Sequence, residues 1–322
     1  MAETSHLFVV DPLKDLNLTL DSSVRMAAAL AGRGHKIYFA TIENVHLSRQ
    51  HGPYAVAEQV TFSGDKEPSP VVSGSHRLPM SQMTAVHMRK DPPIDERYFA
   101  VTWILSRLPS HVRQYNNSEA LRAINEKLSI LDFPEDSDPC LVSGDPVEIH
   151  RFAMEHGAGD IIIKPLTLYG GRGVERIKCD EYDEAGLLSE LRSLTEGGKS
   201  PRIVQPFNHA IFDGEIRVFC AFGEAITFCL KKPKKGEFLA NTARGATLED
   251  YVPSKKMLGR IEGIAKAMQS KGVYLTGFDV IGEKVSEINI TSPRLLAKDL
   301  KPSYFERIAL LMEQDLDKER RQ

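Results

Sequence analysis

Residues 277–293 read GFDVIGEKVSEINITSP, and this stretch predicts a β-hairpin that carries a metal site. A three-residue loop at 282–284 would pair Asp279 with Glu287. Because side chains alternate faces along a strand, these two carboxylates and Asn289 project from one face, and the other face is apolar. Opposed carboxylates repel each other, and an oxygen-bound cation such as Mg²⁺ removes that penalty. The alternative is a pair of solvated acids on an exposed strand.

A glycine-rich loop follows an apolar strand earlier in the chain. Residues 161–166 read IIIKPL, and residues 167–173 read TLYGGRG. Gly170 and Gly171 lack Cβ atoms, so backbone N–H groups can approach an anion closely, and Lys164 can reach a phosphate as a point charge. The loop matches neither the Walker A motif nor the Rossmann fingerprint. An ordinary hairpin with a glycine turn is the alternative interpretation.

Several lysines and arginines are expected to face the same region. One such residue would be a surface charge by default, but a group of them beside a carboxylate hairpin indicates neutralisation of a triphosphate. The residues are Lys127, Arg217, Lys231, Lys232 and Arg244. The polar, glycine-punctuated stretch at 232–247 has the composition of a mobile lid.

The composition is that of an ordinary globular protein. The 322 residues, 42% hydrophobic and 26% charged, suffice for two or three domains, and the net charge of −3 favours neither nucleic acid nor an anionic membrane as partner. The four cysteines lack the spacing of a zinc site. We find no signal peptide and no apolar stretch that could span a membrane, so we expect a cytoplasmic protein.

The first part of the chain predicts an α/β fold that begins as a doubly wound domain. A strand at 6–10, an Ala-rich helix at 22–32 and a strand at 36–40 form a right-handed crossover unit. Residues 84–88 are a further buried strand, before a helix at 96–107. The Pro-, Gly- and Ser-rich residues at 51–79 are typical of loops or weak strands.

A helix from Ser118 to Leu131, with Ser118 as N-cap, precedes a break in composition. We place the domain boundary there, giving an N-terminal domain at 1–125 and a second domain at 126–322. The second half alternates strands and turns in an α+β pattern. We expect its helices at about 181–195 and 254–270, and a charged surface helix over the last 20 or so residues.

These segments, in this order, resemble prokaryotic glutathione synthetase, which has an ATP-grasp fold. The resemblance covers almost the whole chain and is most specific in MRKDPP and in the hairpin quoted above. The matching segments read VVDPLKDLNLTLDSS, MRKDPPIDERY, LRAINEKL, DIIIKPLTLYGGRG, QPFNHAIFDGEIRVF and TGFDVIGEKVSEINITSP. The resemblance implies two small subdomains, at about 126–204 and 205–322, with ATP between their sheets and the lid at 232–247.

The resemblance also implies roles for individual residues. ATP would be bound through Lys127, Lys164, Gly170, Gly171, Gln205, Pro206, Phe207, Asn208 and Asp213. The metal ligands would be Asp279, Glu287 and Asn289, and the residues nearest the chemistry Arg217, Arg244 and Asn289. The peptide and amine substrates would contact Arg89, Asp91, Arg217, Asn241, Arg244 and Ser292.

The reaction that the resemblance implies is the ATP-dependent joining of γ-glutamylcysteine to glycine through an acyl phosphate. It implies Mg²⁺, with Mn²⁺ as an alternative, and a homo-oligomer. The lid departs from the family pattern, because FLANTARGA keeps Asn241, Arg244 and Gly245 but lacks one arginine near Leu239 or Ala240. Two alternatives therefore stay open. One is an ATP-grasp ligase of different specificity, and the other is a non-catalytic ATP-binding protein.

Overall fold

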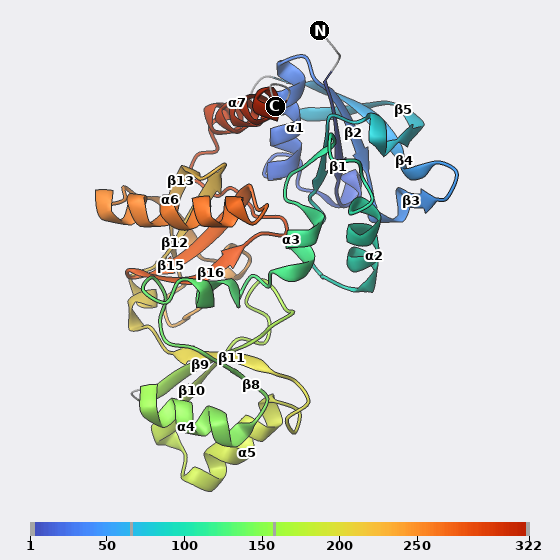
Figure 1. Cartoon of the computed structure of the whole chain (residues 1–322). Helices are drawn as coiled ribbons and strands as arrows, with labels where there is room; N and C mark the ends of the chain where they lie inside the picture. The colour runs from blue at the N-terminus through green and yellow to red at the C-terminus, as the bar shows by residue number, and fades with distance from the viewer. Residues whose placement is uncertain (1–3, 65–66, 157–158, 320–322) are drawn as a thin grey trace.

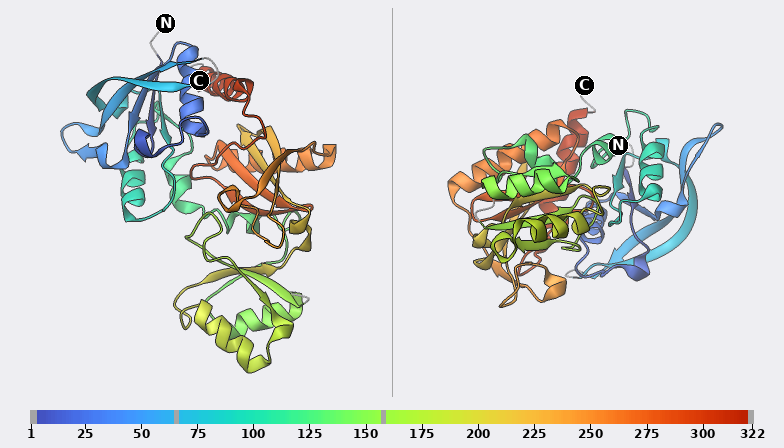
Figure 2. Two further views of the ribbon diagram at one scale, coloured as in Figure 1. Left: turned by 180° about the vertical axis from the view of Figure 1, so that it is seen from behind. Right: turned by 90° about the horizontal axis from the view of Figure 1, so that it is seen from below.

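The computed structural model describes residues 4–64, 67–156 and 159–319, which build three sheets that follow one another along the molecule (Figure 1). The N-terminal sheet lies at one end, and a sheet from the middle of the chain lies at the other. The left view in Figure 2 shows the same arrangement from behind, with the third sheet in between. No described helix is both long and apolar enough to cross a membrane.

The N-terminal sheet has parallel strands at its centre, as the crossover pattern predicted. β1 (Ser5–Val9) pairs in parallel with β2 (Lys36–Ala40) and β6 (Ala85–Met88), and β6 pairs with β7 (Arg113–Gln114). All five side chains of β1 are buried, which is typical of a strand covered on both faces.

The other edge of this sheet corrects the prediction of loops or weak strands at 51–79. β4 (Gly52–Ser63) and β5 (Ser69–Pro79) form a long antiparallel hairpin, and β4 also pairs with β2 and β3 (Val45–Ser48). The segment escapes the usual strand pattern because β5 is a mostly exposed edge strand that tolerates Ser, Gly and Pro.

Two N-terminal helices agree with the sequence pattern, and the C-terminal helix differs from it. α1 (Ser22–Gly32) begins at Asp21, whose carboxylate accepts from two backbone N–H groups, and α2 is Glu96–Leu105. α7 (Pro302–Glu319) is not simply a surface helix. It packs on α1 and buries one face, including Phe305, Ile308 and Met312, in the core of the N-terminal domain.

The second sheet has strand order β10-β9-β11-β8. β8 is Leu141–Ser143, β9 Asp160–Pro165, β10 Glu175–Lys178 and β11 Arg202–Pro206. One face packs on α4 (Pro146–His156) and α5 (Glu184–Leu194), which lie side by side over its outer side in Figure 2. The sequence pattern predicted α5, and α4 was not predicted. The opposite face is turned toward the third sheet (Figure 1).

The third sheet has strand order β14-β13-β12-β15-β16. Its strands are β12 (Glu215–Ala221), β13 (Glu224–Lys232), β14 (Thr247–Asp250), β15 (Leu275–Ile281) and β16 (Lys284–Asn289). Apolar residues on one face, such as Val218, Phe278 and Ile288, pack with α6 (Lys255–Ser270). The alternate residues carry the charges and face a cavity.

The helix expected from Ser118 to Leu131 is wrong in its extent. α3 spans only Ser118–Ala123, and its N-cap is Asn117, whose side chain accepts from Glu119 N at 2.7 Å. Asn125 then interrupts the helix, because its side-chain oxygen accepts from the backbone N–H groups of Lys127 and Leu128. Lys127 therefore lies on a loop, and a short 3₁₀ turn (Ser129–Asp132) follows.

Candidate active site

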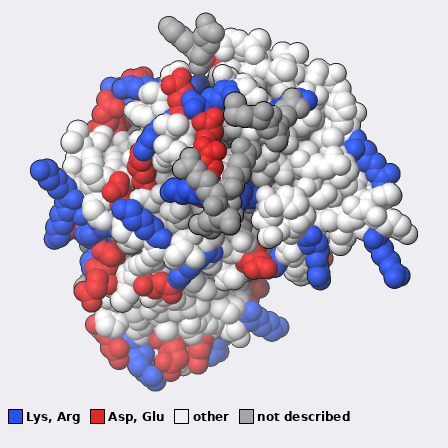
Figure 3. Space-filling view, turned by 45° about the horizontal axis from the view of Figure 1, so that its top comes forward, with Lys and Arg blue, Asp and Glu red and all other residues white. Residues whose placement is uncertain are grey.

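A cavity of about 740 Å³ lies where the three parts of the molecule meet. Its walls come from the inner faces of the second and third sheets, from the glycine loop and the lid, and from the loops at 91–92 and 291–296. The face of the protein in Figure 3 has positive and negative side chains intermingled. The cavity is likewise lined by both acidic and basic side chains.

The two predicted phosphate-binding lysines line the cavity from different elements. Lys164 ends β9, and its Nζ donates to Oε1 of Gln205 on β11 at 2.9 Å. Lys127 Nζ donates to the carbonyl of Leu168 at 2.7 Å, which ties the boundary loop to the glycine loop. Burial lowers the pKa of Lys164, and the carboxylates of Glu287 and Glu215 partly offset that effect. Both lysines can therefore reach one bound phosphate chain.

The glycine loop needs its glycines for backbone conformation and for space. Gly170, Gly171 and Gly173 all have φ between 64° and 75°, a region that other residues rarely adopt. A Cβ on Gly173 would lie 2.8 Å from Pro165 Cγ, and one on Gly171 would meet Leu239 of the lid at 3.4 Å. Asn241 of the lid also donates to the carbonyl of Gly170 at 2.7 Å. The lid thus lies directly over this loop.

The predicted adenine-binding residues Gln205–Asn208 line the cavity at the end of β11. Phe207 packs with Ile162, Ile211 and Ala240 in a small apolar cluster. The Arg176 guanidinium lies 3.9 Å from the Phe207 ring centroid. An apolar slot with backbone polar groups at its edge suits a flat heterocycle.

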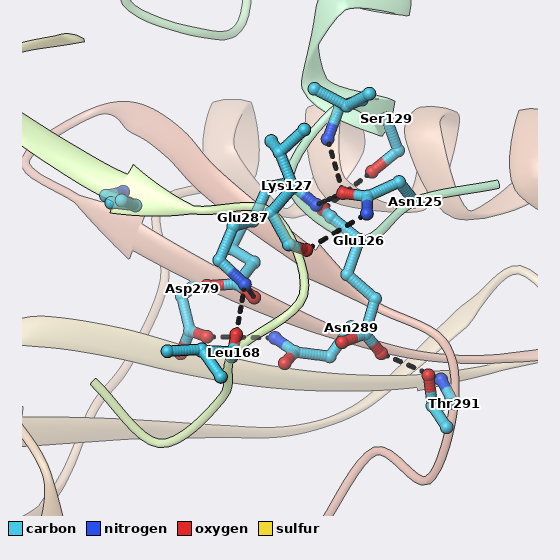
Figure 4. Close-up of polar contacts among 12 residues, drawn as sticks. Asn125, Glu126, Lys127, Ser129, Leu168, Asp279, Glu287, Asn289 and Thr291 are labelled. Atoms are coloured by element: carbon cyan, nitrogen blue, oxygen red, sulfur yellow. Dashed lines mark hydrogen bonds and ion pairs between the residues drawn. The ribbon is translucent and has the colours of Figure 1, made fainter. Parts of the chain in front are cut away.

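The hairpin of β15 and β16 confirms the predicted pairing of Asp279 with Glu287 and corrects its turn. Ile281 pairs with Lys284, so the loop has two residues rather than three. A bulge at Ser286 restores the register before Glu287 is reached. The predicted pairing is right because the shorter loop and the bulge compensate each other. Asp279, Glu287 and Asn289 all line the cavity (Figure 4).

Side-chain cations already offset the repulsion between the two carboxylates, which corrects the argument that a metal alone would do so. Asp279 accepts from Arg217 Nη1 at 2.9 Å and from Lys231 Nζ at 2.8 Å. Glu287 pairs with Lys127 at 3.4 Å. Burial alone would raise the pKa of Asp279, but Arg217 and Lys231 outweigh it and hold that pKa well below its usual range.

The ligand set nevertheless fits a divalent cation. Asn289 Nδ2 donates to Asp279 Oδ2 at 2.9 Å, which leaves the amide oxygen available as a ligand beside the Glu287 carboxylate. Carboxylate and amide oxygens are the donors that hard divalent cations prefer. Over the described residues, no group of three His, Cys, Asp or Glu side chains could hold a metal. The set therefore depends on the asparagine as its third member.

The remaining predicted residues divide into those that line the cavity and those that do not. Asp91, Arg217, Asn241, Arg244 and Ser292 line it. Arg89 lies behind the wall, where it donates to Ser23 Oγ at 3.1 Å and to the carbonyl of Pro293 at 2.9 Å. Asp213 is exposed on the turn before β12 and is not among the lining residues.

Three acidic residues that line the cavity were not predicted from the sequence, namely Glu126, Asp138 and Glu215. Glu126 Oε1 accepts from the backbone N–H groups of Ile290 and Thr291 at 2.7 and 2.8 Å, and so fixes the end of β16 (Figure 4). Glu215 pairs with Lys231, and burial, followed by the charge of Asp279, raises the pKa of Glu215 to about 7. Glu126 and Glu215 lie in two of the segments that resemble the family, LRAINEKL and QPFNHAIFDGEIRVF, and Glu126 directly precedes Lys127, so their place in these segments was the available signal.

Comparison with known proteins identifies the family. The model of the prokaryotic glutathione synthetase N-terminal domain matches residues 5–122, and that of the prokaryotic glutathione synthetase ATP-grasp domain matches residues 126–299. The chain belongs to the prokaryotic glutathione synthetase family. It is therefore an ATP-dependent ligase that forms ADP, and this family uses ATP together with a divalent metal ion.

Relatives and solved structures agree with this family. Glutathione synthetase of Vibrio parahaemolyticus is 33% identical over 287 residues, covering 88% of this chain and 89% of the relative. That of Parasynechococcus marenigrum is 33% identical over 314 residues, covering 95% and 99%. The fold resembles D-cycloserine synthetase DcsG (TM-score 0.68, 15% identity, 97% and 99% covered) and the ATP-grasp ligase PsnB (TM-score 0.64, 19% identity, 96% and 99% covered).

Proposed function

We propose that this glutathione synthetase homologue joins γ-glutamylcysteine to glycine at the cost of one ATP. The observation that supports this most is the placing of two lysines, the buried Lys127 and the partly buried Lys164, against the Asp279–Glu287–Asn289 face in one cavity. A triphosphate needs positive groups along its length and a cation between its oxygens, and this cavity offers both. The N-terminal domain forms the wall at the end of the cavity where the peptide would bind.

The chemistry proceeds in two steps. A carboxylate oxygen of the cysteine residue attacks the γ-phosphorus of ATP, the bond to the bridging oxygen breaks, and an acyl phosphate and ADP form. The glycine nitrogen, as the free amine, then attacks the acyl carbon, phosphate leaves, and the nitrogen loses a proton. Lys127, Lys164 and Arg217 position the phosphate oxygens and neutralise their charge, and no side chain needs to form a covalent bond.

A divalent cation held by Asp279, Glu287 and Asn289 would neutralise charge on the β- and γ-phosphates. We propose Mg²⁺ for this role, because it commonly binds through one or two carboxylates plus substrate phosphates. The lid at 232–247, which we propose to be mobile, would exclude water and so protect the acyl phosphate from hydrolysis.

A second candidate is an ATP-grasp ligase with another peptide or amino-acid specificity. The observation that favours it is the lid, where an arginine of the family pattern is absent near Leu239 or Ala240 and Leu239 lies against Gly171 of the glycine loop. A non-catalytic ATP-binding protein has less support, because the lysines and all three proposed metal ligands are present and share one cavity.

The test is phosphate release with purified protein, Mg²⁺ and ATP. We expect release that requires both γ-glutamylcysteine and glycine, with glutathione appearing in equal amount by mass spectrometry. Release with other acid–amine pairs but not with this pair would support the second candidate. ATP binding without release for any pair would support the non-catalytic alternative. Size-exclusion chromatography on the same sample tests the proposed homo-oligomer.

A further inference from the structure

Arg294 is held in the cavity by the residues on either side of it. The carbonyl of Pro293 accepts from Arg89 at 2.9 Å, and the N–H of Leu295 donates to Ser22 Oγ at 2.9 Å. Pro293 and Leu295 are both buried, whereas Arg294 is exposed and lines the cavity. The backbone is thus fixed to the N-terminal domain on both sides of an arginine that projects into the site.

The Arg294 guanidinium has no partner among the described residues, neither a hydrogen bond nor an ion pair. Arg217, in contrast, is tied to Asp279. An arginine fixed at its backbone, free at its head and open to a substrate cavity is suited to bind a carboxylate through two parallel N–H···O bonds.

Asp91 supplies the opposite charge in the same part of the cavity. Its loop is joined to that of Arg294, because the Ser292 hydroxyl donates to the carbonyl of Arg89 at 3.2 Å, and Asp91 lines the cavity too. The neighbouring cation Lys90 is already paired with Asp11 at 2.8 Å. An acid and a base are therefore presented together at the end of the cavity formed by the N-terminal domain, away from the proposed adenine slot at β11.

We propose that Asp91 and Arg294 together bind the free amino-acid head of a γ-linked glutamyl peptide, with Asp91 on the α-ammonium and Arg294 on the α-carboxylate. This inference rests on the proposed function and names what selects its peptide. In a γ-linked glutamate both charged groups stand on one carbon, far from the carboxylate that is phosphorylated. An α-linked glutamate separates them by its side chain, so it cannot satisfy both residues at once.

Two analogues of γ-glutamylcysteine test the two contacts separately. 4-Aminobutyryl-cysteine lacks the α-carboxylate, and glutaryl-cysteine lacks the α-ammonium. With Arg294→Gln we expect the KM for γ-glutamylcysteine to rise about 10- to 100-fold and the KM for 4-aminobutyryl-cysteine to stay unchanged. With Asp91→Asn we expect the opposite pattern, with glutaryl-cysteine unaffected. The KM values for ATP and glycine should not change in either variant.

Lys298→Gln is the matched control, because Lys298 is an exposed cation on the same loop that does not line the cavity. In Arg294→Gln, an equal rise in KM for γ-glutamylcysteine and for 4-aminobutyryl-cysteine would overturn the inference. A raised KM for glycine in this variant would overturn it as well. Wild-type turnover with γ-glutamylcysteine but no effect of Arg294→Gln refutes the inference alone. No wild-type turnover with γ-glutamylcysteine and glycine refutes the proposed function and the inference with it.

Discussion

Lys231 Nζ lies 2.8 Å from Asp279 Oδ1, and both side chains are nearly buried in the floor of the cavity. The same lysine pairs with Glu215, so one cation neutralises two carboxylates on adjacent strands. The field of these carboxylates outweighs burial and raises the pKa of Lys231. Removing this cation would leave Glu215 without its partner and Asp279 with Arg217 alone, and an unpaired carboxylate in this setting is costly.

We predict that Lys231→Met lowers the free energy of unfolding by about 3 kcal/mol, the loss typical when one partner of a buried ion pair is removed. The matched control is Lys232→Met, because Lys232 is the next residue and forms an exposed pair with Glu249 at 2.9 Å. That variant should lose at most about 1 kcal/mol. Urea denaturation at pH 7.5 measures both. Similar losses in the two variants would show that the buried pair is not a stability element.

We predict that Glu287→Gln and Asn289→Ala each lose about 100-fold or more of their phosphate release at limiting Mg²⁺ while staying folded. Glu287→Gln replaces a charged carboxylate with a neutral amide, and Asn289→Ala removes the amide oxygen, so each weakens the face that would hold the cation against the phosphates. Glu283→Gln, in the exposed turn of the same hairpin, is the control. Folded Glu287→Gln with wild-type turnover at limiting Mg²⁺ would remove this residue from the metal site.

The sequence was sufficient for the parts of the site that lie on regular strands. Alternation of side chains placed Asp279, Glu287 and Asn289 on one face, and the structure confirms that arrangement. The parallel order of β1, β2 and β6 also followed from apolar strands separated by a helix. Such features depend on local periodicity, which a single sequence records directly.

The remainder depends on contacts between distant segments. Glu126 acts by binding backbone N–H groups more than 160 residues away, so no local pattern marks it. The short length of α3 follows from the side chain of Asn125, and the burial of one face of α7 follows from its packing on α1. The neutralisation of Asp279 likewise requires cations from two other strands.

We predict that Lys164→Ala weakens ATP binding about 10- to 100-fold, as expected for the loss of one hydrogen bond to a charged group, and leaves the melting temperature nearly unchanged. Lys164 reaches the cavity from the end of β9 and contacts only Gln205 by hydrogen bond within the described residues. Lys178→Ala, on the neighbouring strand β10 and outside the cavity, is the control. Titration calorimetry measures the affinity. An unchanged affinity would assign Lys164 a structural role.

We predict that the lid at 232–247 is cleaved by trypsin in the free protein and protected by MgATP plus γ-glutamylcysteine. Its few contacts with the glycine loop, through Leu239 and Asn241, are weak enough to open. Cleavage at the exposed Arg49, in a turn of the N-terminal domain, serves as the reference. Mass spectrometry of the fragments distinguishes the sites. Equal cleavage of the lid with and without ligands would identify it as a fixed loop.

Three histidines form a chain through the N-terminal domain to α7. A ring nitrogen of His87 lies 3.0 Å from one of His6, and the other ring nitrogen of His6 lies 2.9 Å from one of His35. The second ring nitrogen of His35 lies 2.9 Å from a carboxylate oxygen of Glu313. Burial is the main cause that lowers the pKa of His6 to about 3 and that of His87 well below its usual value. At His6 the neighbouring His35 lowers the pKa further and Glu313 opposes this. At His87 the neighbouring His6 and Arg89 lower the pKa further.

A lowered histidine pKa means that the unfolded chain takes up the proton first as the pH falls through about 6.5, so folding becomes less favourable below that pH. Each buried histidine should cost about 1.4 kcal/mol per pH unit there. The raised pKa of Glu215 acts in the opposite sense, so the prediction concerns the difference between variant and wild type.

His87→Phe keeps the parallel stacking on Phe8 but cannot titrate. Between pH 6 and pH 5, the free energy of unfolding of this variant should fall by about 1.4 kcal/mol less than that of the wild type. Urea denaturation at the two pH values measures this difference. The control is His51→Gln, because His51 is exposed. An identical pH dependence in the wild type and both variants would show that His87 titrates normally in the folded state.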